Sequence, residues 1–159
     1  MAIYYFDSSA IVKRHVAEVG SAWIISIADP AAGHHIYVAN LAGVEVPAAI
    51  NRRVREATVN AADAAAGLAN FQNDFASQYN IIEVTDAIIT SAGALTGRHP
   101  LRAYDAVQLA ATLEVNKQIQ ALGPQTAGVL TLTMVCADRG LNAAAAAEGL
   151  GVDNPNNHP

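Results

Sequence analysis

Charged residues are scarce in this chain of 159 residues, because Asp, Glu, Lys and Arg together make up only 14% of the sequence. An average soluble protein carries roughly 25% charged residues, and a disordered chain combines high charge with low hydrophobicity. The apolar share of 52% therefore excludes a disordered protein and fits a single globular domain. The net charge of −5 argues against broad electrostatic binding to nucleic acid, so any such site must be local.

The chain also has little cysteine and no long apolar run. Its one cysteine, Cys136, can form neither an internal disulfide nor a thiolate zinc site, which is typical of a reducing compartment. No apolar stretch approaches the roughly 20 residues that cross a bilayer. Residues 1–6 lack the basic start of an export signal. We therefore expect a cytoplasmic protein with no membrane segment.

Alanine is abundant instead, at about a fifth of the residues, and it is the best helix former. Short runs of β-forming apolar residues separate the helical stretches. The predicted strands are 3–6, 35–39, 81–84, 129–136 and a short one near Val152. The predicted helices are one that starts near Ser8, then 20–28, 40–56 with Asn40 as its N-cap, 60–79, 85–96, 102–119 and 138–148.

Strands that alternate with helices predict an α/β fold, in which helices on both faces cover a central parallel sheet of four to five strands. We expect one domain over residues 1–153, since no linker or internal repeat divides the chain. A loop is expected over 123–128. Residues 154–159 form a polar tail with two prolines, for which we expect little order.

Two acids follow predicted strands. Asp7 comes directly after the first strand, and Asp138 comes two residues after the fourth. In a parallel sheet the functional crevice lies beyond the carboxyl ends of the strands. An Asp in this place also commonly caps the next helix, so position alone leaves both interpretations open.

Two further acids lie on predicted helices with few cations near them. Glu45 has only apolar residues three and four positions away, and Asp105 has only Arg102 as a candidate partner. Asp105 shares a polar stripe with Gln108 and Thr112, so an exposed helix face is the alternative. In a chain this poor in charge, four acids embedded in apolar sequence indicate one shared site.

Carboxylates held close together repel each other and take up protons unless a cation joins them. Oxygen ligands without a cysteine or histidine cluster suit Mg²⁺ or Mn²⁺. Such ions act on phosphates by activating a water molecule and neutralising charge in the transition state. The four acids therefore fit metal-assisted phosphodiester hydrolysis, although their spacing alone does not establish it.

The segments that contain these acids are specific enough to compare with a known family. In chain order they read YYFDSSAIVKRH, LAGVEVPAAINRR, LRAYDAVQLAAT and CADRGLNAAAAAEGL. In this order they resemble the four acidic motifs of PIN-domain ribonucleases, and most closely those of the VapC-type toxins of bacterial toxin–antitoxin pairs. The resemblance covers nearly the whole chain.

The resemblance implies an acidic basin that binds Mg²⁺ or Mn²⁺ and cuts RNA. By position, its catalytic and metal-binding acids would be Asp7, Glu45, Asp105 and Asp138. Ser8 matches the small hydroxyl residue that often follows the first acid and is a substrate-binding candidate. Cys136 departs from the family, which commonly has Thr or Ser there. The partners that the resemblance implies are RNA, a cognate VapB-like antitoxin and a second copy of the chain in a homodimer.

Basic residues near the acids are candidates for holding RNA phosphates. The densest cluster is Arg52, Arg53 and Arg55, on the same predicted helix as Glu45. A solvated helix face explains this cluster equally well. A second candidate group, at residues 13–15, follows Asp7 and reads Lys-Arg-His.

Other conspicuous residues have ordinary explanations. His34 and His35 are adjacent on a predicted strand, so they point to opposite faces and do not suit one metal ion. Cys136 is expected to be a small buried side chain and not a nucleophile. The aromatic and aliphatic residues of 68–75 are expected in the core or in a dimer contact.

Two alternatives remain to be weighed. A phosphoacceptor receiver domain needs paired acids after the first strand and a lysine after the last, and this chain has neither. A catalytically inactive PIN-like module that binds protein or RNA is the more serious alternative. The presence of all four acids argues against it.

Overall fold

The computed structural model describes residues 1–122 and 131–159, and its centre is a five-stranded parallel sheet. The strands lie in the order β3-β2-β1-β4-β5. Their bounds are β1 Ile3–Phe6, β2 His35–Ala39, β3 Asn80–Ile82, β4 Leu132–Val135 and β5 Gly151–Asp153. The predicted α/β class with a parallel sheet is confirmed.

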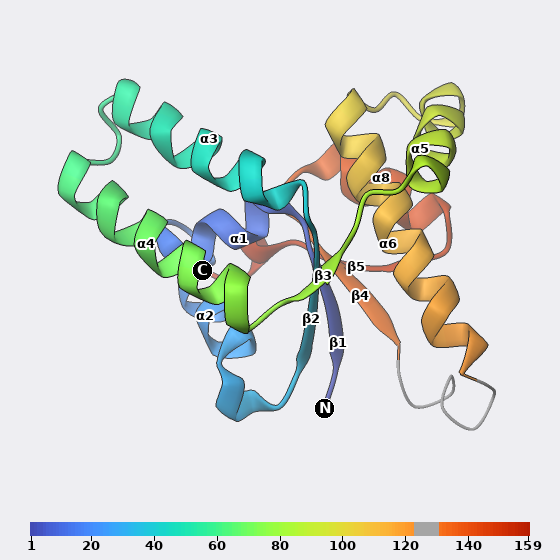
Figure 1. Cartoon of the computed structure of the whole chain (residues 1–159), viewed down its shortest axis with the longest axis horizontal. Coiled ribbons are helices and arrows are strands. Elements are labelled where there is room, and N and C mark those ends of the chain that lie inside the picture. Colours follow the sequence, from blue (N-terminus) through green and yellow to red (C-terminus); the bar gives the residue numbers. More distant parts are fainter. Residues whose placement is uncertain (123–130) are drawn as a thin grey trace.

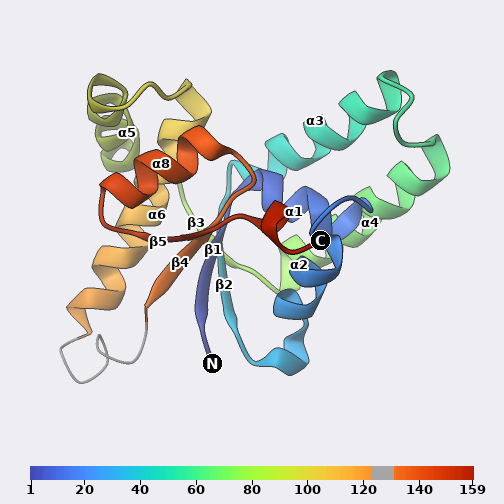
Figure 2. The ribbon, with the colours of Figure 1, turned by 180° about the vertical axis from the view of Figure 1, so that it is seen from behind.

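Helices cover both faces of this sheet. One layer contains α1 Ser8–His15, α2 Ser21–Ala28, α3 Ala42–Arg55 and α4 Ala61–Ser77, and the other contains α5 Asp86–Arg98, α6 Ala103–Ala121 and α8 Arg139–Ala147. Figure 1 shows the two layers on opposite sides of the strands, and Figure 2 shows the same arrangement from behind. None of the described helices combines the length and hydropathy that a bilayer-spanning segment requires.

The pleat of β1 divides the core into two clusters. Ile3 and Tyr5 pack with α5, α6 and α8, whereas Phe6 packs with α1, α2, α3 and α4. Alternate residues of a strand point to opposite faces, and both faces are covered here. This explains why β1 reads as a continuous apolar run.

The strand order places a crevice beside β1. The chain passes from β1 to β2 and β3 on one side, and β4 and β5 pair on the other side of β1. A parallel sheet opens at its carboxyl edge where the strand order reverses in this way. Asp7 lies at this place, and its backbone N–H donates to the Val135 carbonyl at 3.1 Å.

The start of α3 differs from the prediction. Asn40 does not cap this helix, because its side-chain oxygen accepts a hydrogen bond from the Val84 N–H at 3.2 Å. The N-cap is Leu41, and Pro47 lies inside the helix. The third strand ends at Ile82, two residues before the predicted end at Val84.

The C-terminal tail also differs, because it is folded against the domain. Pro155 is buried at the start of the 3₁₀ helix η2 Pro155–Asn157. The His158 ring stacks on Trp23 of α2, with 4.0 Å between ring centroids. Its Nε2 lies 2.8 Å from an oxygen of Asp153. The prediction of little order is therefore wrong, since apolar and ring contacts hold this segment.

The remaining elements follow the predictions within a few residues. Asn60 caps α4, and Thr85 caps α5 through a bond from the Ile88 N–H. The short last strand predicted near Val152 is β5. The predicted loop at 123–128 and the first two residues of the predicted strand 129–136 lie outside the described residues.

Candidate acidic active site

A pocket of about 450 Å³ at the carboxyl edge of the sheet gathers most of the predicted site residues. Its walls come from α1, α3, α6 and the C-terminal segment. The predicted residues that line it are Asp7, Ser8, Lys13, Glu45, Arg52, Arg53 and Asp105. Asp138 and Arg55 are not among the residues that line this pocket.

Asp7 is buried, with 7% of its surface exposed. It caps α1, because its Oδ2 accepts bonds from the Ser9 N–H at 3.0 Å and the Ser9 hydroxyl at 2.6 Å. The Cys136 thiol donates to the same oxygen at 3.4 Å. Burial raises the pKa of Asp7, and the bonds from Ser9 and Cys136 offset part of that rise. The capping and functional interpretations of this acid are thus compatible.

Glu45 lies in the first turn of α3 and faces the same pocket. Its Oε2 accepts hydrogen bonds from the Ser8 hydroxyl and from the Gln108 amide. Burial raises its pKa most, the hydrogen bonds from Ser8 and Gln108 lower it, and the charges of Asp7 and Asp105 raise it. Glu45 is therefore close enough to Asp7 and Asp105 for their charges to repel its own.

Asp105 and Asp138 are linked through one arginine. The Arg102 Nε lies 3.3 Å from Asp105 Oδ2, and its terminal nitrogen lies 3.9 Å from Asp138 Oδ2. Asp138 also caps α8 by accepting a bond from the Leu141 N–H at 2.8 Å. Asp138 therefore lies beside the pocket and is connected to the other acids through Arg102.

The predicted basic residues separate into two groups. Arg52 and Arg53 line the pocket, although both oxygens of Glu18 hold Arg53, at 3.0 and 3.1 Å. Lys13 also lines it and lies 3.6 Å from Glu18. Arg14 lies elsewhere and pairs with Asp74 at 2.8 Å.

Four polar residues of the pocket region were not predicted from the sequence. Ser9, Glu18 and Asn156 line the pocket, and Gln108 lies directly behind Glu45. The spacing of Gln108 could have predicted its place near the acids, because it lies three positions after Asp105 on α6 and so shares the same side of the helix. The alternative of an exposed face for this stripe is wrong at Gln108, which is only 1% exposed.

Cys136 and residues 68–75 behave as expected. Cys136 is fully buried, and burial raises the pKa of its thiol well above the usual range, which does not suit a nucleophile. The thiol donates a hydrogen bond to Asp7. Phe71 is buried in the core, and Leu68 and Phe75 pack against it there.

The donor chemistry of the pocket fits a hard divalent cation, since its acids supply oxygen ligands and repel one another. In the arrangement described for residues 1–122 and 131–159, no group of three or more His, Cys, Asp and Glu side chains surrounds one metal position. Each carboxylate accepts hydrogen bonds from protein groups instead. Ser9 donates to Asp7, Ser8 and Gln108 donate to Glu45, and Arg102 donates to Asp105.

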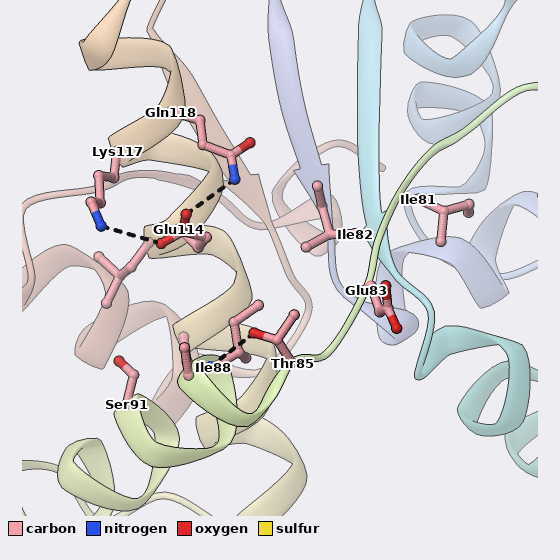
Figure 3. A pocket seen from close by; sticks show the side chains of 12 residues that line it. Ile81, Ile82, Glu83, Thr85, Ile88, Ser91, Glu114, Lys117 and Gln118 are labelled. Atoms are coloured by element: carbon pink, nitrogen blue, oxygen red, sulfur yellow. Dashed lines mark hydrogen bonds and ion pairs between the residues drawn. The ribbon is translucent and has the colours of Figure 1, made fainter.

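A larger pocket, of about 680 Å³, lies between β3, α5 and α6. Figure 3 shows Glu114 of α6 joined to Lys117 and Gln118, with Ile82 of β3 pointing toward this helix. None of the four predicted acids lines it. Size alone therefore does not identify the functional site, and the smaller acidic pocket is the candidate.

Two curated relatives resemble the sequence over most of its length. Ribonucleases VapC45 and VapC49 of Mycobacterium tuberculosis are each 32% identical to this chain over 115 residues, which is 72% of this chain and 78% of each relative. No family model matches the sequence.

Solved structures share the fold at much lower identity. VapBC2 from Rickettsia felis, bound to a DNA fragment from the promoter, matches with a TM-score of 0.59 and 11% identity over 96% of this chain and 98% of that chain. FitAcB from Neisseria gonorrhoeae matches with a TM-score of 0.62 and 14% identity over 96% of this chain and 97% of that chain.

The parallel sheet, its two helix layers and the acids at its carboxyl edge define a domain of the PIN-like α/β class. The identity and coverage of the two curated relatives show which family within this class the chain belongs to. The chain belongs to the VapC ribonuclease family.

Proposed function

We propose that this protein is an endoribonuclease that hydrolyses RNA phosphodiester bonds with Mg²⁺ or Mn²⁺ as its cofactor. The main support is the placement of Asp7, Glu45 and Asp105 around one pocket. Burial raises the pKa of Glu45, the hydrogen bonds from Ser8 and Gln108 lower it, and the charges of Asp7 and Asp105 also raise it. A divalent cation would relieve that repulsion. The relatives at 32% identity are named as ribonucleases.

In this proposal, the acidic residues of the pocket bind the cation and the basic residues bind the substrate. The proposed cation ligands are Asp7, Glu45, Asp105 and Asp138. When bound, the cation supplies an activated water molecule and neutralises charge on the phosphate. Ser8 orients Glu45 through its hydroxyl, and Arg52 and Arg53 at the pocket wall bind RNA phosphates.

The biological setting that we propose is a toxin–antitoxin pair in the cytoplasm. Solved structures with this fold include VapBC2 and a FitAB complex bound to DNA. We propose a VapB-like antitoxin as the partner and a homodimer of this chain as the unit that binds it. A partner arginine would suit the acidic pocket, because its forked donors match carboxylates.

One observation favours a second candidate, a catalytically inactive module that binds protein or RNA. Arg102 contacts Asp105 and approaches Asp138, so the chain already supplies a positive charge between two acids. In such a module this pairing would persist in the presence of Mg²⁺, and the acids would serve only as a binding surface.

Cleavage of RNA by the purified protein separates the two candidates. The protein, freed of any co-purifying partner, is incubated with total RNA in Mg²⁺, in Mn²⁺ and in EDTA. We expect cleavage only with the metals, and products that carry a 5′-phosphate and a 3′-hydroxyl. RNA that stays intact in both metals would contradict the proposed activity and support the inactive module.

A matched pair of variants then tests the acidic pocket. Asp105→Asn keeps the shape of the side chain but removes its charge, so cleavage should fall by orders of magnitude while the fold persists. Asp86→Asn is the control, because Asp86 also lies in the first turn of a helix but does not line the pocket. Normal cleavage by a folded Asp105→Asn variant would refute the assignment.

A further inference from the structure

A buried amide lies behind the acidic pocket. Gln108 of α6 is 1% exposed, and its side chain makes three hydrogen bonds at the edge of the site. Its Oε1 accepts a bond from the Tyr5 hydroxyl at 2.7 Å. Its Nε2 donates to Glu45 Oε2 at 2.5 Å and to the Ser8 hydroxyl at 3.2 Å.

These partners determine which way the amide faces. A carboxylate can only accept hydrogen bonds, so the NH₂ group of Gln108 must point toward Glu45. The Tyr5 hydroxyl supplies a donor on the opposite side, which suits the amide oxygen. Burial, and then the charges of Asp7 and Glu45, raise the pKa of Tyr5 well above its usual range, so this phenol keeps its proton.

The support that Glu45 receives is electrically neutral. Ser8 and Gln108 both donate to its Oε2 without adding a positive charge. Among the described residues no hydrogen bond reaches its Oε1. Glu45 is therefore oriented while its charge and one oxygen remain available, whereas Arg102 partly neutralises Asp105.

We propose that Gln108 is a positioning residue for this site, because its amide, fixed by the Tyr5 hydroxyl, holds Glu45 ready to bind a divalent cation. This inference rests on the proposed function of the acidic pocket. Gln108 itself does not line the pocket and acts through Glu45. Groups that hold metal ligands in this way commonly change metal affinity by about 10- to 100-fold when they are replaced.

The chemistry of the amide makes different replacements distinguishable. Gln108→Leu removes the donor to Glu45 and keeps a similar volume. Gln108→Glu keeps the shape but places a second carboxyl group against Glu45. Tyr5→Phe leaves Gln108 in place and removes only the hydroxyl that fixes its orientation.

Mn²⁺ binding measured by calorimetry is the test, with cleavage kinetics as the second readout. We expect Gln108→Leu to weaken Mn²⁺ binding by about 10- to 100-fold, with a loss in kcat at saturating RNA and little change in KM. Tyr5→Phe should change both quantities in the same direction by a smaller factor. Val115→Ala is the control, because it opens a cavity in the same helix at a buried residue of the core without touching the site.

Four results have separate meanings. Unchanged Mn²⁺ affinity in a folded Gln108→Leu variant overturns the inference and leaves the proposed function intact. If that variant does not fold, unchanged Mn²⁺ affinity in Tyr5→Phe overturns it instead. A wild-type protein that binds no Mn²⁺ and cuts no RNA overturns the proposed function first. Weakened binding in the site variants but not in Val115→Ala supports the inference.

Discussion

Two consecutive hydroxyls at the start of α1 orient acids from different parts of the chain. The Ser8 hydroxyl donates to Glu45 of α3, and the Ser9 hydroxyl donates to Asp7. Neighbouring side chains of a helix point about 100° apart, so the two donors do not compete for one acid. Each hydroxyl therefore controls one carboxylate of the pocket.

Arg52 provides the sharpest test of RNA binding at the level of one residue. It lines the pocket and its side chain is 65% exposed, with Glu56 only 3.9 Å away. In Arg52→Ala, RNA binding should weaken and the slope of log affinity against log salt should fall by about 0.7, as for one lost phosphate contact on a single strand. Cleavage within a saturated complex should change less.

Arg55→Ala is the matched control for this measurement. Arg55 lies in the same last turn of α3 but does not line the pocket. Its removal costs the same formal charge, so it should leave the salt slope nearly unchanged. Equal slopes for the two variants would mean that the arginines act only as a solvated helix face.

The acids could be predicted from the sequence because each one interrupts an apolar stretch. The orientation of the polar stripe on α6 could not be predicted. Periodicity shows that Gln108 and Thr112 share a face of the helix but not whether that face is buried or exposed. The helix is apolar on most sides, and tertiary packing turned its polar stripe inward. The link between Arg102 and Asp138 depends on tertiary structure in the same way.

Among the elements, α1 packs against α4 at a histidine that stays neutral. The side chain of His15 is 2% exposed and its ring meets Phe71 edge-on, with 5.7 Å between centroids. Burial, and then the charge of Arg14, lower its pKa to about 4. This environment does not fit the phosphate-binding role considered for His15.

This shift makes stability depend on pH. The unfolded chain binds a proton at His15 near pH 6.5, whereas the folded protein does so near pH 4. The contribution of neutral His15 to the free energy of unfolding is therefore fully present above pH 6.5 and is lost as the pH falls toward 4. We expect a loss of about 2 kcal/mol in the free energy of unfolding between pH 8 and pH 5.

Denaturant unfolding across this pH range measures the effect, and His15→Gln is the reference because it cannot titrate. The wild type should lose more stability than the variant as the pH falls. Parallel pH profiles for the two proteins would show that His15 takes up its proton as readily in the fold as in the unfolded chain.

Most helices and strands could be predicted because hydrophobic periodicity and caps are local signals. Asn60 and Thr85 cap the helices that follow them, as the sequence indicates. Asn40 was misread because an Asn before a helix can instead accept a bond from a distant strand end, here Val84. A local sequence pattern does not show that the Val84 N–H will bond to the Asn40 side chain.

For the molecule as a whole, the parallel sheet could be predicted from alternating elements, but the strand order could not. An apolar run shows that a strand exists without showing which neighbours it pairs with. The reversal at β1 decides where Asp7 and Glu45 meet, and it is a property of the complete fold.

Binding of an antitoxin and binding of a cation should be linked across this molecule. If a partner arginine enters the acidic pocket, the partner and Mg²⁺ each lower the affinity of the other by the same factor. Calorimetry should therefore show weaker Mg²⁺ binding to the complex than to the free protein. Equal Mg²⁺ affinity in both states would mean that the partner inhibits by blocking access of RNA.

The docked C-terminal segment gives the protein a built-in optical reporter. Its single tryptophan, Trp23, is the residue on which His158 stacks, and Asn156 of the same segment lines the acidic pocket. A Cβ at Gly20 would lie 2.2 Å from the Pro155 carbonyl oxygen, so Gly20→Ala should displace the segment and change the tryptophan emission.

Gly33→Ala is the comparison, because Gly33 has a similar left-handed backbone but no atom within 4 Å of an added Cβ. Both variants bear backbone strain of about 1–2 kcal/mol, yet only the first should alter the fluorescence. Identical spectra for the two would show that the segment is not held at Gly20. The emission of this one residue would then report, without any label, whether the segment that carries Asn156 is in place beside the pocket.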